Sequence, residues 1–416
     1  MILKKKLFIF LFIIYLSLIA GFYLEEDSLG GAFADYVSLN HLAERFNENF
    51  IFTLLNYDLF GHRHSPIFFI LKSFLINFGE NIQKIIFLHI YLLIPFFFYK
   101  SLRIVFSKSD KNNLILLSCI ILLFPTFRSY SIWPDSHLLG ILFFIISIFF
   151  YCKFLEGKKT FKNAIFNTIF LALSAYISPN FGFFVIFFIH EFYLKFKLNK
   201  EFLLILFINL IISIPFFLYL FYFDVNFIFN TGYWDIGENI FSITNLSNKF
   251  LIIISLFLFY LFPFFLSKTI SYNVTNISIK ITFIYFIVFI FGIFFFDFSL
   301  SYSLTNSGGG FFYNLSQLLF SNNMLFFIIC FFTFIYLIKI FTIDKKNILL
   351  FLILILSNPQ NTLWQANFSP TIYFSILFLF NLNFKEDSIT KNAIYFNYAY
   401  FLLYLVSALT YKFILN

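Results

Sequence analysis

Long apolar segments recur along the whole chain, and they constrain its fold more than any other feature. Hydrophobic residues make up 61% of the 416 residues and charged residues only 12%, about half the charged fraction of an ordinary soluble domain. A bilayer leaves no water for the backbone, so apolar segments of this kind fold as helices that satisfy their own hydrogen bonds. We therefore expect an all-α fold, a polytopic transmembrane helical bundle of about 11–13 spans, in a single integral membrane domain over residues 1–416. The apolar segments lie near residues 7–24, 84–104, 112–127, 136–154, 162–178, 180–196, 201–222, 249–267, 279–296, 323–341, 346–357, 370–384 and 393–413.

The charges between these segments predict their orientation. Lys4 to Lys6 precede the first apolar segment, and Glu25 to Asp27 follow it without a small-residue cleavage site, which indicates an uncleaved first helix. If the spans alternate, 21 of the 28 Lys and Arg residues fall in inner loops and seven in outer ones. By the positive-inside rule the N-terminus is cytoplasmic, in a multi-pass protein that we expect in a bacterial inner (plasma) membrane. Topology thus explains the net charge of +8, and no nucleic-acid partner is predicted.

Residues 25–83 form the long first outer (periplasmic) loop, and two interfacial helices are expected in it. Leu39, Leu42, Phe46 and Phe50 recur at helical spacing, which suits a helix lying on the membrane surface. Pro66 opens a second helix that is too short to span comfortably. Reading it as a tilted span would invert the charge bias of every later loop.

The same loop begins with candidate catalytic carboxylates. Glu26 and Asp27, with Asp35 shortly after them, could accept a proton from an attacking hydroxyl. They would also suit a divalent cation, although no metal site and no certain cofactor are predicted. The alternative is that these acids merely end the first span.

Two basic or mixed clusters follow. His62, Arg63 and His64 could bind a phosphate at headgroup depth, or could anchor the loop to lipid phosphates. The segment Arg128 to His137 places an ionisable group at the mouth of a span, where it is costly unless paired or functional. Its candidates are Arg128 for phosphate and Trp133, Asp135 and His137 for the substrate or acceptor. Alternatively, Arg128 and Asp135 pair with each other and Trp133 belongs to an interfacial aromatic belt.

In their order along the chain, these clusters resemble the GT-C class of integral membrane glycosyltransferases. That class includes the protein O-mannosyltransferases, the lipid A aminoarabinose transferases and the Rgt-like bacterial transferases. Its members have a comparable number of spans and an acidic pair after the first one, at the position of Glu26-Asp27 here. Two further motifs are similar: His64-Ser65-Pro66-Ile67-Phe68-Phe69 resembles a His-Pro-Pro-Leu-Tyr-Tyr-like stretch, and Trp133-Pro134-Asp135 a Tyr-Pro-Glu-like one.

The resemblance implies transfer of a sugar from a polyprenyl-phosphate donor to a glycan, lipid or protein acceptor on the outer face of the membrane. It implies that Arg63 with His62 and His64, or Arg128, stabilises the departing phosphate, and that Glu26 or Asp27 takes the proton. The acidic pair here is Glu-Asp rather than the commoner Asp-Glu, so the identity of the base stays open between the two.

Two other functions remain as alternatives. A polysaccharide polymerase or ligase also uses lipid-linked sugars, but typically relies on a large later outer loop with arginines, and the later outer loops here hold only Lys249. A lipid or polysaccharide flippase or transporter would place charges inside its spans, whereas here they cluster at the ends.

Overall fold

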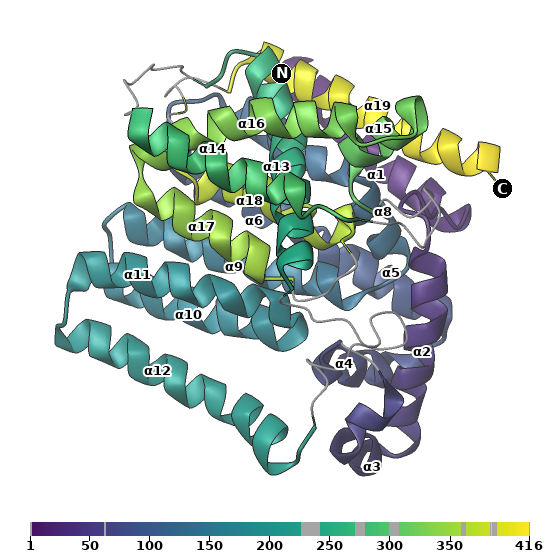
Figure 1. Cartoon of the computed structure of the whole chain (residues 1–416). Helices are drawn as coiled ribbons and strands as arrows, with labels where there is room; N and C mark the ends of the chain where they lie inside the picture. Colours follow the sequence, from purple (N-terminus) through teal and green to yellow (C-terminus); the bar gives the residue numbers. More distant parts are fainter. Residues whose placement is uncertain are drawn as a thin grey trace.

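The fold is helical throughout the part of the chain that the structure describes. The structure is a computed structural model, and it describes residues 2–61, 64–225, 242–270, 279–298, 308–358, 363–382, 384 and 389–415. In those residues there is no β-strand, and the only β-type backbone pairings are two isolated bridges, Ile270 with Phe384 and Gly308 with Trp364. The predicted all-α polytopic bundle is confirmed (Figure 1).

The first half of the chain contains α1 to α12. Their bounds are α1 Ile2–Tyr23, α2 Ala32–Glu48, α3 Phe50–Leu55, η1 Tyr57–Phe60, α4 Pro66–Ile76, α5 Glu80–Tyr91, α6 Leu93–Val105, α7 Lys111–Cys119, η2 Ile120–Leu123, α8 Pro125–Ile132, α9 Ser136–Leu155, α10 Thr160–Ile177, η3 Pro179–Phe183, α11 Phe184–Phe196, α12 Lys200–Phe217 and η4 Leu218–Tyr222.

The second half contains α13 to α19. Their bounds are α13 Ile243–Leu266, α14 Ile279–Phe294, α15 Phe311–Phe320, α16 Met324–Ile343, α17 Lys345–Leu356, η7 Gln365–Phe368, α18 Thr371–Phe378 and α19 Lys391–Leu415. Each predicted apolar segment therefore coincides with one helix or with two or three consecutive ones.

Six helical segments among the described residues are long and apolar enough to cross a membrane, or up to seven if the bent pair Lys111–Leu123 and Pro125–Ile132 counts as one span. The protein is thus a multi-pass membrane protein. The predicted count of about 11–13 spans also included shorter apolar runs, such as Phe8–Tyr23 and Phe283–Phe294.

Helix α2 lies transverse to the bundle, along the right-hand edge of Figure 1. It buries Leu39, Leu42 and Phe46, as the periodicity predicts. Phe50 does not share this face: Asn49 ends α2, its side chain caps α3, and Phe50 is 40% exposed. Pro66 opens α4 as predicted, with Ser65 as the N-cap. The segment after α1 is therefore largely helical, and its helix α2 packs against α4 and α8.

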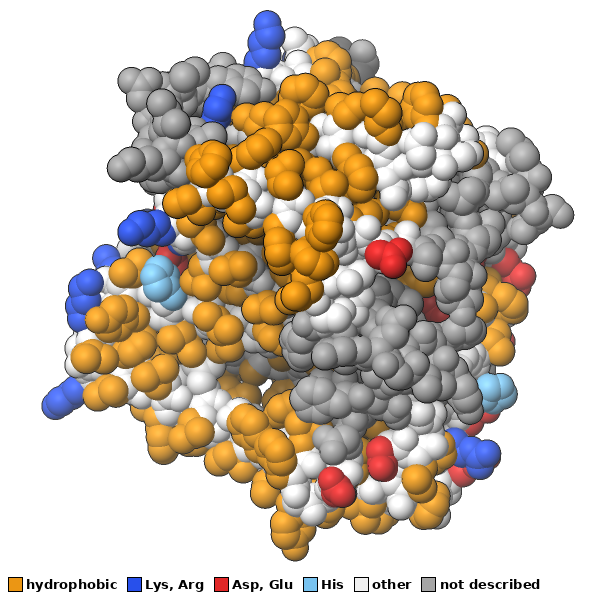
Figure 2. Space-filling model, viewed as in Figure 1, with side chains coloured by type: hydrophobic (Ala, Val, Ile, Leu, Met, Phe, Trp, Pro, Cys, Tyr) orange, Lys and Arg blue, Asp and Glu red, His pale blue; other side chains and the backbone are white. Residues whose placement is uncertain are grey.

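The two ends of the bundle differ in charge. In Figure 2 hydrophobic side chains cover much of the visible face, Lys and Arg gather mainly at the left and top, and most Asp and Glu lie at the right and below. The left end carries the connection from α11 to α12, and the right end carries α2 (Figure 1). The candidate site lies at the α2 end.

Candidate functional site

A buried ion pair joins the segment after the C-terminal end of α1 to α8. The Arg128 guanidinium donates to both carboxylate oxygens of Glu26, with Nε 2.6 Å from Oε1. It also donates to the Ser17 hydroxyl at 3.1 Å and to the Ser17 carbonyl at 2.9 Å. Both charged side chains are at most 9% exposed. Four of the five N–H groups of an arginine are thereby used inside the protein.

Gly21 makes room for this pair. A Cβ atom at this position of α1 would lie 2.4 Å from Glu26 Oε2 and 3.1 Å from Arg128 Nη2. Only a glycine lets the ion pair approach the helix backbone this closely. The pairing of Arg128 with Asp135, the alternative suggested by the sequence, does not form, because Glu26 takes the guanidinium instead.

Asp27, next along the chain, holds the start of α2. Its carboxylate accepts hydrogen bonds from the backbone N–H groups of Gly30 at 3.0 Å, Gly31 at 2.8 Å and Phe33 at 3.3 Å. Gly31 has φ 115°, which favours glycine at this turn. The negative charge satisfies donors at a helix N-terminus, where the helix dipole also favours it.

Asp35 lies in the first turn of the helix that Asp27 holds. Unlike Glu26 and Asp27, it is exposed. Asp27, Asp35 and Asp135 all lie within electrostatic range of the Tyr130 hydroxyl on α8. Tyr130 therefore lies near carboxylates from two regions that are far apart in sequence, the start of α2 and the start of α9.

The junction of α8 and α9 packs against the same point. The Trp133 indole N–H donates to the Glu26 carbonyl at 3.2 Å, and its ring contacts Phe33 and Tyr36. Asp135 is the N-cap of α9 and accepts from the His137 N–H at 2.7 Å. The acidic and tryptophan clusters are thus joined directly.

His64 connects the start of α4 to this junction. Its ring Nδ1 lies 2.9 Å from the Ser136 hydroxyl, and its carbonyl accepts from the Tyr57 hydroxyl at 2.6 Å. The neighbouring Ser65 hydroxyl donates to the Tyr176 carbonyl. His62 and Arg63 lie outside the described residues. His137 stacks on Phe181 with the ring centroids 5.9 Å apart.

Two lysines that the sequence reasoning missed lie under this cluster. Lys72 of α4 is fully buried, and its Nζ lies 3.9 Å from the Tyr36 ring centroid and has no hydrogen-bond partner among the described residues. Lys84 of α5 pairs with Glu80 and lies 3.9 Å from the Trp133 ring. A single charge within the apolar segment 66–76 was the signal that could have identified Lys72.

Burial controls the ionisation of Lys72 and Tyr36, which form a layer with Lys84 and Trp133. It lowers the pKa of the Lys72 amine to about 7, against the opposing attraction of Asp135 and Glu80. Burial likewise raises the pKa of the Tyr36 hydroxyl, which donates to the Gln83 side-chain oxygen at 3.2 Å. The layer is therefore held together by ring contacts and neutral hydrogen bonds as much as by ion pairs.

No group of three His, Cys, Asp or Glu side chains in the described residues is arranged to hold a metal ion. Glu26 instead binds the Arg128 guanidinium, and Asp27 and Asp135 accept hydrogen bonds from backbone N–H groups. Chemically, this arrangement presents the exposed Asp35 carboxylate on α2, in a region that also contains hydroxyl, indole and imidazole groups.

Comparison of the chain with protein-family models, with curated proteins and with solved structures finds no match. Its function is therefore argued from the site itself.

Proposed function

We propose that this protein is a membrane glycosyltransferase that moves a sugar from a polyprenyl-phosphate donor to an acceptor at the outer face. The observation that carries the proposal is the meeting of Glu26 and Asp27, His64, and the segment 128–137 at one end of the bundle. These segments are the ones whose order along the chain resembles the GT-C class.

Asp35 is the residue that we propose as the base. It is exposed, and the first turn of α2 is an electrostatically favourable place for its negative charge. Glu26 and Asp27 have their carboxylates engaged inside the protein, by Arg128 and by the α2 backbone respectively. Their proposed role is to fix the position of α2, and thereby of Asp35.

The reaction needs one proton transfer and one displacement. The acceptor hydroxyl gives its proton to the Asp35 carboxylate while its oxygen forms a bond to the anomeric carbon. The bond from that carbon to the donor phosphate breaks, and the phosphate leaves with the electron pair. Such a direct displacement inverts the anomeric centre.

The phosphate needs positive charge near the start of α4. In the proposal His62, Arg63 and His64 supply it, because Arg128 is already neutralised by Glu26. Trp133, Asp135 and His137 line the acceptor side. The prenyl chain would lie against the apolar outer surface of the bundle, in the lipid.

The test uses cells that lack the protein and are complemented with wild type, Asp35→Asn or Asp58→Asn. Mass spectrometry of envelope glycans and polyprenyl-phosphate sugars is the readout. We expect one sugar to vanish from a glycan and its lipid-linked donor to accumulate, with wild type and Asp58→Asn reversing both and Asp35→Asn neither. Asp58 is the control because it is an acid of the same loop, at η1.

Unchanged glycans in cells lacking the protein would refute the transferase. Full rescue by Asp35→Asn, with glycans otherwise dependent on the protein, would refute only the assignment of the base.

A further inference from the structure

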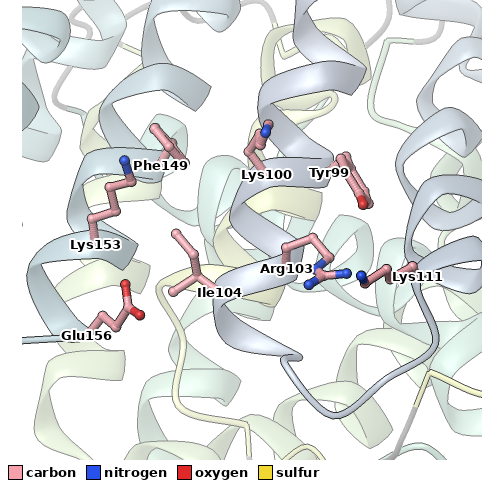
Figure 3. A pocket seen from close by; sticks show the side chains of 8 residues that line it. All are labelled: Tyr99, Lys100, Arg103, Ile104, Lys111, Phe149, Lys153 and Glu156. Carbon is pink, nitrogen blue, oxygen red and sulfur yellow. The ribbon is translucent and has the colours of Figure 1, made fainter.

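A pocket of about 420 Å³ opens where α6 ends, α7 begins and α9 ends. Four cationic side chains line it, against one carboxylate, that of Glu156 (Figure 3). By the positive-inside rule this end of the bundle is the one we expect to face the cytoplasm. The cations of the pocket are Lys100, Arg103, Lys111 and Lys153.

The four cations of the pocket lack ion-pair partners within the described residues. In the described part of the chain no ion pair joins any of the four to a carboxylate, whereas Glu156 lies 3.4 Å from Lys158, outside the pocket. Like charges gathered in one place repel one another, and the single carboxylate of the pocket offsets only part of that repulsion. An anion bound among them would remove it.

The arrangement of the cations suits a phosphate. In Figure 3 the charged ends of Arg103 and Lys111 approach each other, and the Tyr99 hydroxyl lies on the same side. The planar guanidinium can bind two phosphate oxygens at once, and an ammonium and a phenol add donors from other directions. On the facing helix the Lys153 ammonium lies 4.5 Å from the Phe149 ring centroid, which restricts its side chain.

The surroundings distinguish a lipid from a soluble anion. Large apolar side chains are exposed on the same helices: Phe96 is 49% exposed, Val105 43% and Leu155 53%. A soluble phosphate would leave them uncovered, whereas the acyl chains of a lipid would cover them. Basic pockets between helices at a cytoplasmic surface are a known form of headgroup site.

We propose that this pocket binds the phosphate headgroup of an anionic phospholipid from the leaflet on the N-terminal side. Arg103 and Lys111 bind the phosphate oxygens, while Lys100 and Lys153 supply further positive charge. The site is independent of the transferase proposal, and it lies at the opposite end of the bundle from the carboxylates.

Binding is measured on the purified full-length protein in a neutral detergent. The probes are short-chain phosphatidylglycerol, short-chain phosphatidylcholine, and inorganic phosphate. The variants are Arg103→Gln/Lys111→Gln, Glu156→Gln, and the control Lys159→Gln/Lys162→Gln, which removes two cations outside the pocket at the start of α10.

We expect saturable binding of phosphatidylglycerol, at least about tenfold tighter than that of either other probe. The pocket variant should weaken it at least about tenfold, since each cation near the surface contributes appreciably, and the control should change it little. Glu156→Gln should strengthen it, a gain that misfolding cannot produce.

Equal binding of the two lipids, or no difference between the pocket and control variants, would overturn the site. Inorganic phosphate binding as tightly as phosphatidylglycerol would overturn the lipid assignment and identify a soluble phosphate as the ligand.

Discussion

At the α2 end of the bundle Glu26, Asp27 and Arg128 have their charges bound inside the protein, whereas the four cations where α6 and α9 end line an open pocket and have no carboxylate partner in the described residues. Glu26 and Arg128 bind each other, and Asp27 binds the backbone of α2. Lys100, Arg103, Lys111 and Lys153 share a pocket in which the single carboxylate is 3.4 Å from another lysine.

The difference follows from what each charge costs where it lies. A buried charge is expensive unless paired, so the α2 end can keep its ionised groups only with partners inside the fold. An exposed cation at the membrane surface is solvated without a partner in the protein, so it remains available to bind an anion. The first arrangement fixes a structure, and the second leaves a binding site.

Breaking the buried ion pair should have the largest effect. Arg128→Ala leaves the Glu26 carboxylate buried without its partner, and we expect a loss of about 3–5 kcal/mol of stability. Thermal unfolding in detergent measures it. Arg45→Ala, which removes an arginine from an exposed pair with Glu48, is the matched control and should cost less than about 1 kcal/mol. Equal losses in the two variants would contradict the contrast.

Replacing Lys72, the buried lysine at the α2 end, should raise the stability, whereas breaking the ion pair lowers it. Since the Lys72 amine is buried with no hydrogen-bond partner in the part of the chain that the structure describes, Lys72→Met should stabilise the protein by about 1–3 kcal/mol at neutral pH. The folded-state pKa, about 7, lies below the ordinary 10.5, so between these values the unfolded chain holds the proton and the folded chain does not. Wild-type stability should therefore rise with pH across that window, and the gap to the variant should shrink. Unfolding scans from pH 6 to pH 10 check this; a constant gap would show that Lys72 does not titrate there.

Removing one charge from the α2 cap should have an intermediate effect. Asp27→Asn keeps one acceptor oxygen but replaces the other with an NH₂ group that cannot accept from the α2 backbone. We expect a loss of about 1–2 kcal/mol in thermal unfolding, together with reduced transfer because Asp35 is no longer held. A variant with full stability and no transfer would instead indicate that Asp27 itself is the base.

Neutralising the open pocket should have the smallest effect on stability. Arg103→Gln removes a half-buried cation that has no carboxylate partner in the described residues, so a change within about 0.5 kcal/mol is expected in lipid-free detergent. A loss comparable to that of Arg128→Ala would mean that the two ends do not differ as argued.

The helices and their order could be read from the sequence because the bilayer imposes a strong length and composition rule on each one separately. The predicted segment 136–154 became α9, Ser136–Leu155, and Pro66 opens α4 as its fixed backbone angle requires. Local chemistry of this kind needs no knowledge of neighbours. Phe50 was misplaced because a side-chain cap at Asn49 interrupts the helical period.

Side-chain partners could not be read in the same way. Arg128 has acids near it in sequence, yet it binds Glu26 from 102 positions away. Asp27 and Asp35 are the same residue type in the sequence. In the structure the Asp27 carboxylate accepts from three backbone N–H groups, whereas Asp35 is exposed. Lys72 stands in an apolar segment of the sequence, and only its burial in the folded protein makes its charge costly.

The sequence by itself determined that this is an all-α membrane protein, where its helices lie, and that its charges are segregated along the chain. These properties depend on the transfer of each segment from water to lipid, which is additive along the chain. Only the tertiary structure decided which carboxylate is buried, which cation is neutralised and where four cations share one pocket. Those properties depend on contacts between segments distant in sequence, because pairing and desolvation are set by neighbours in space.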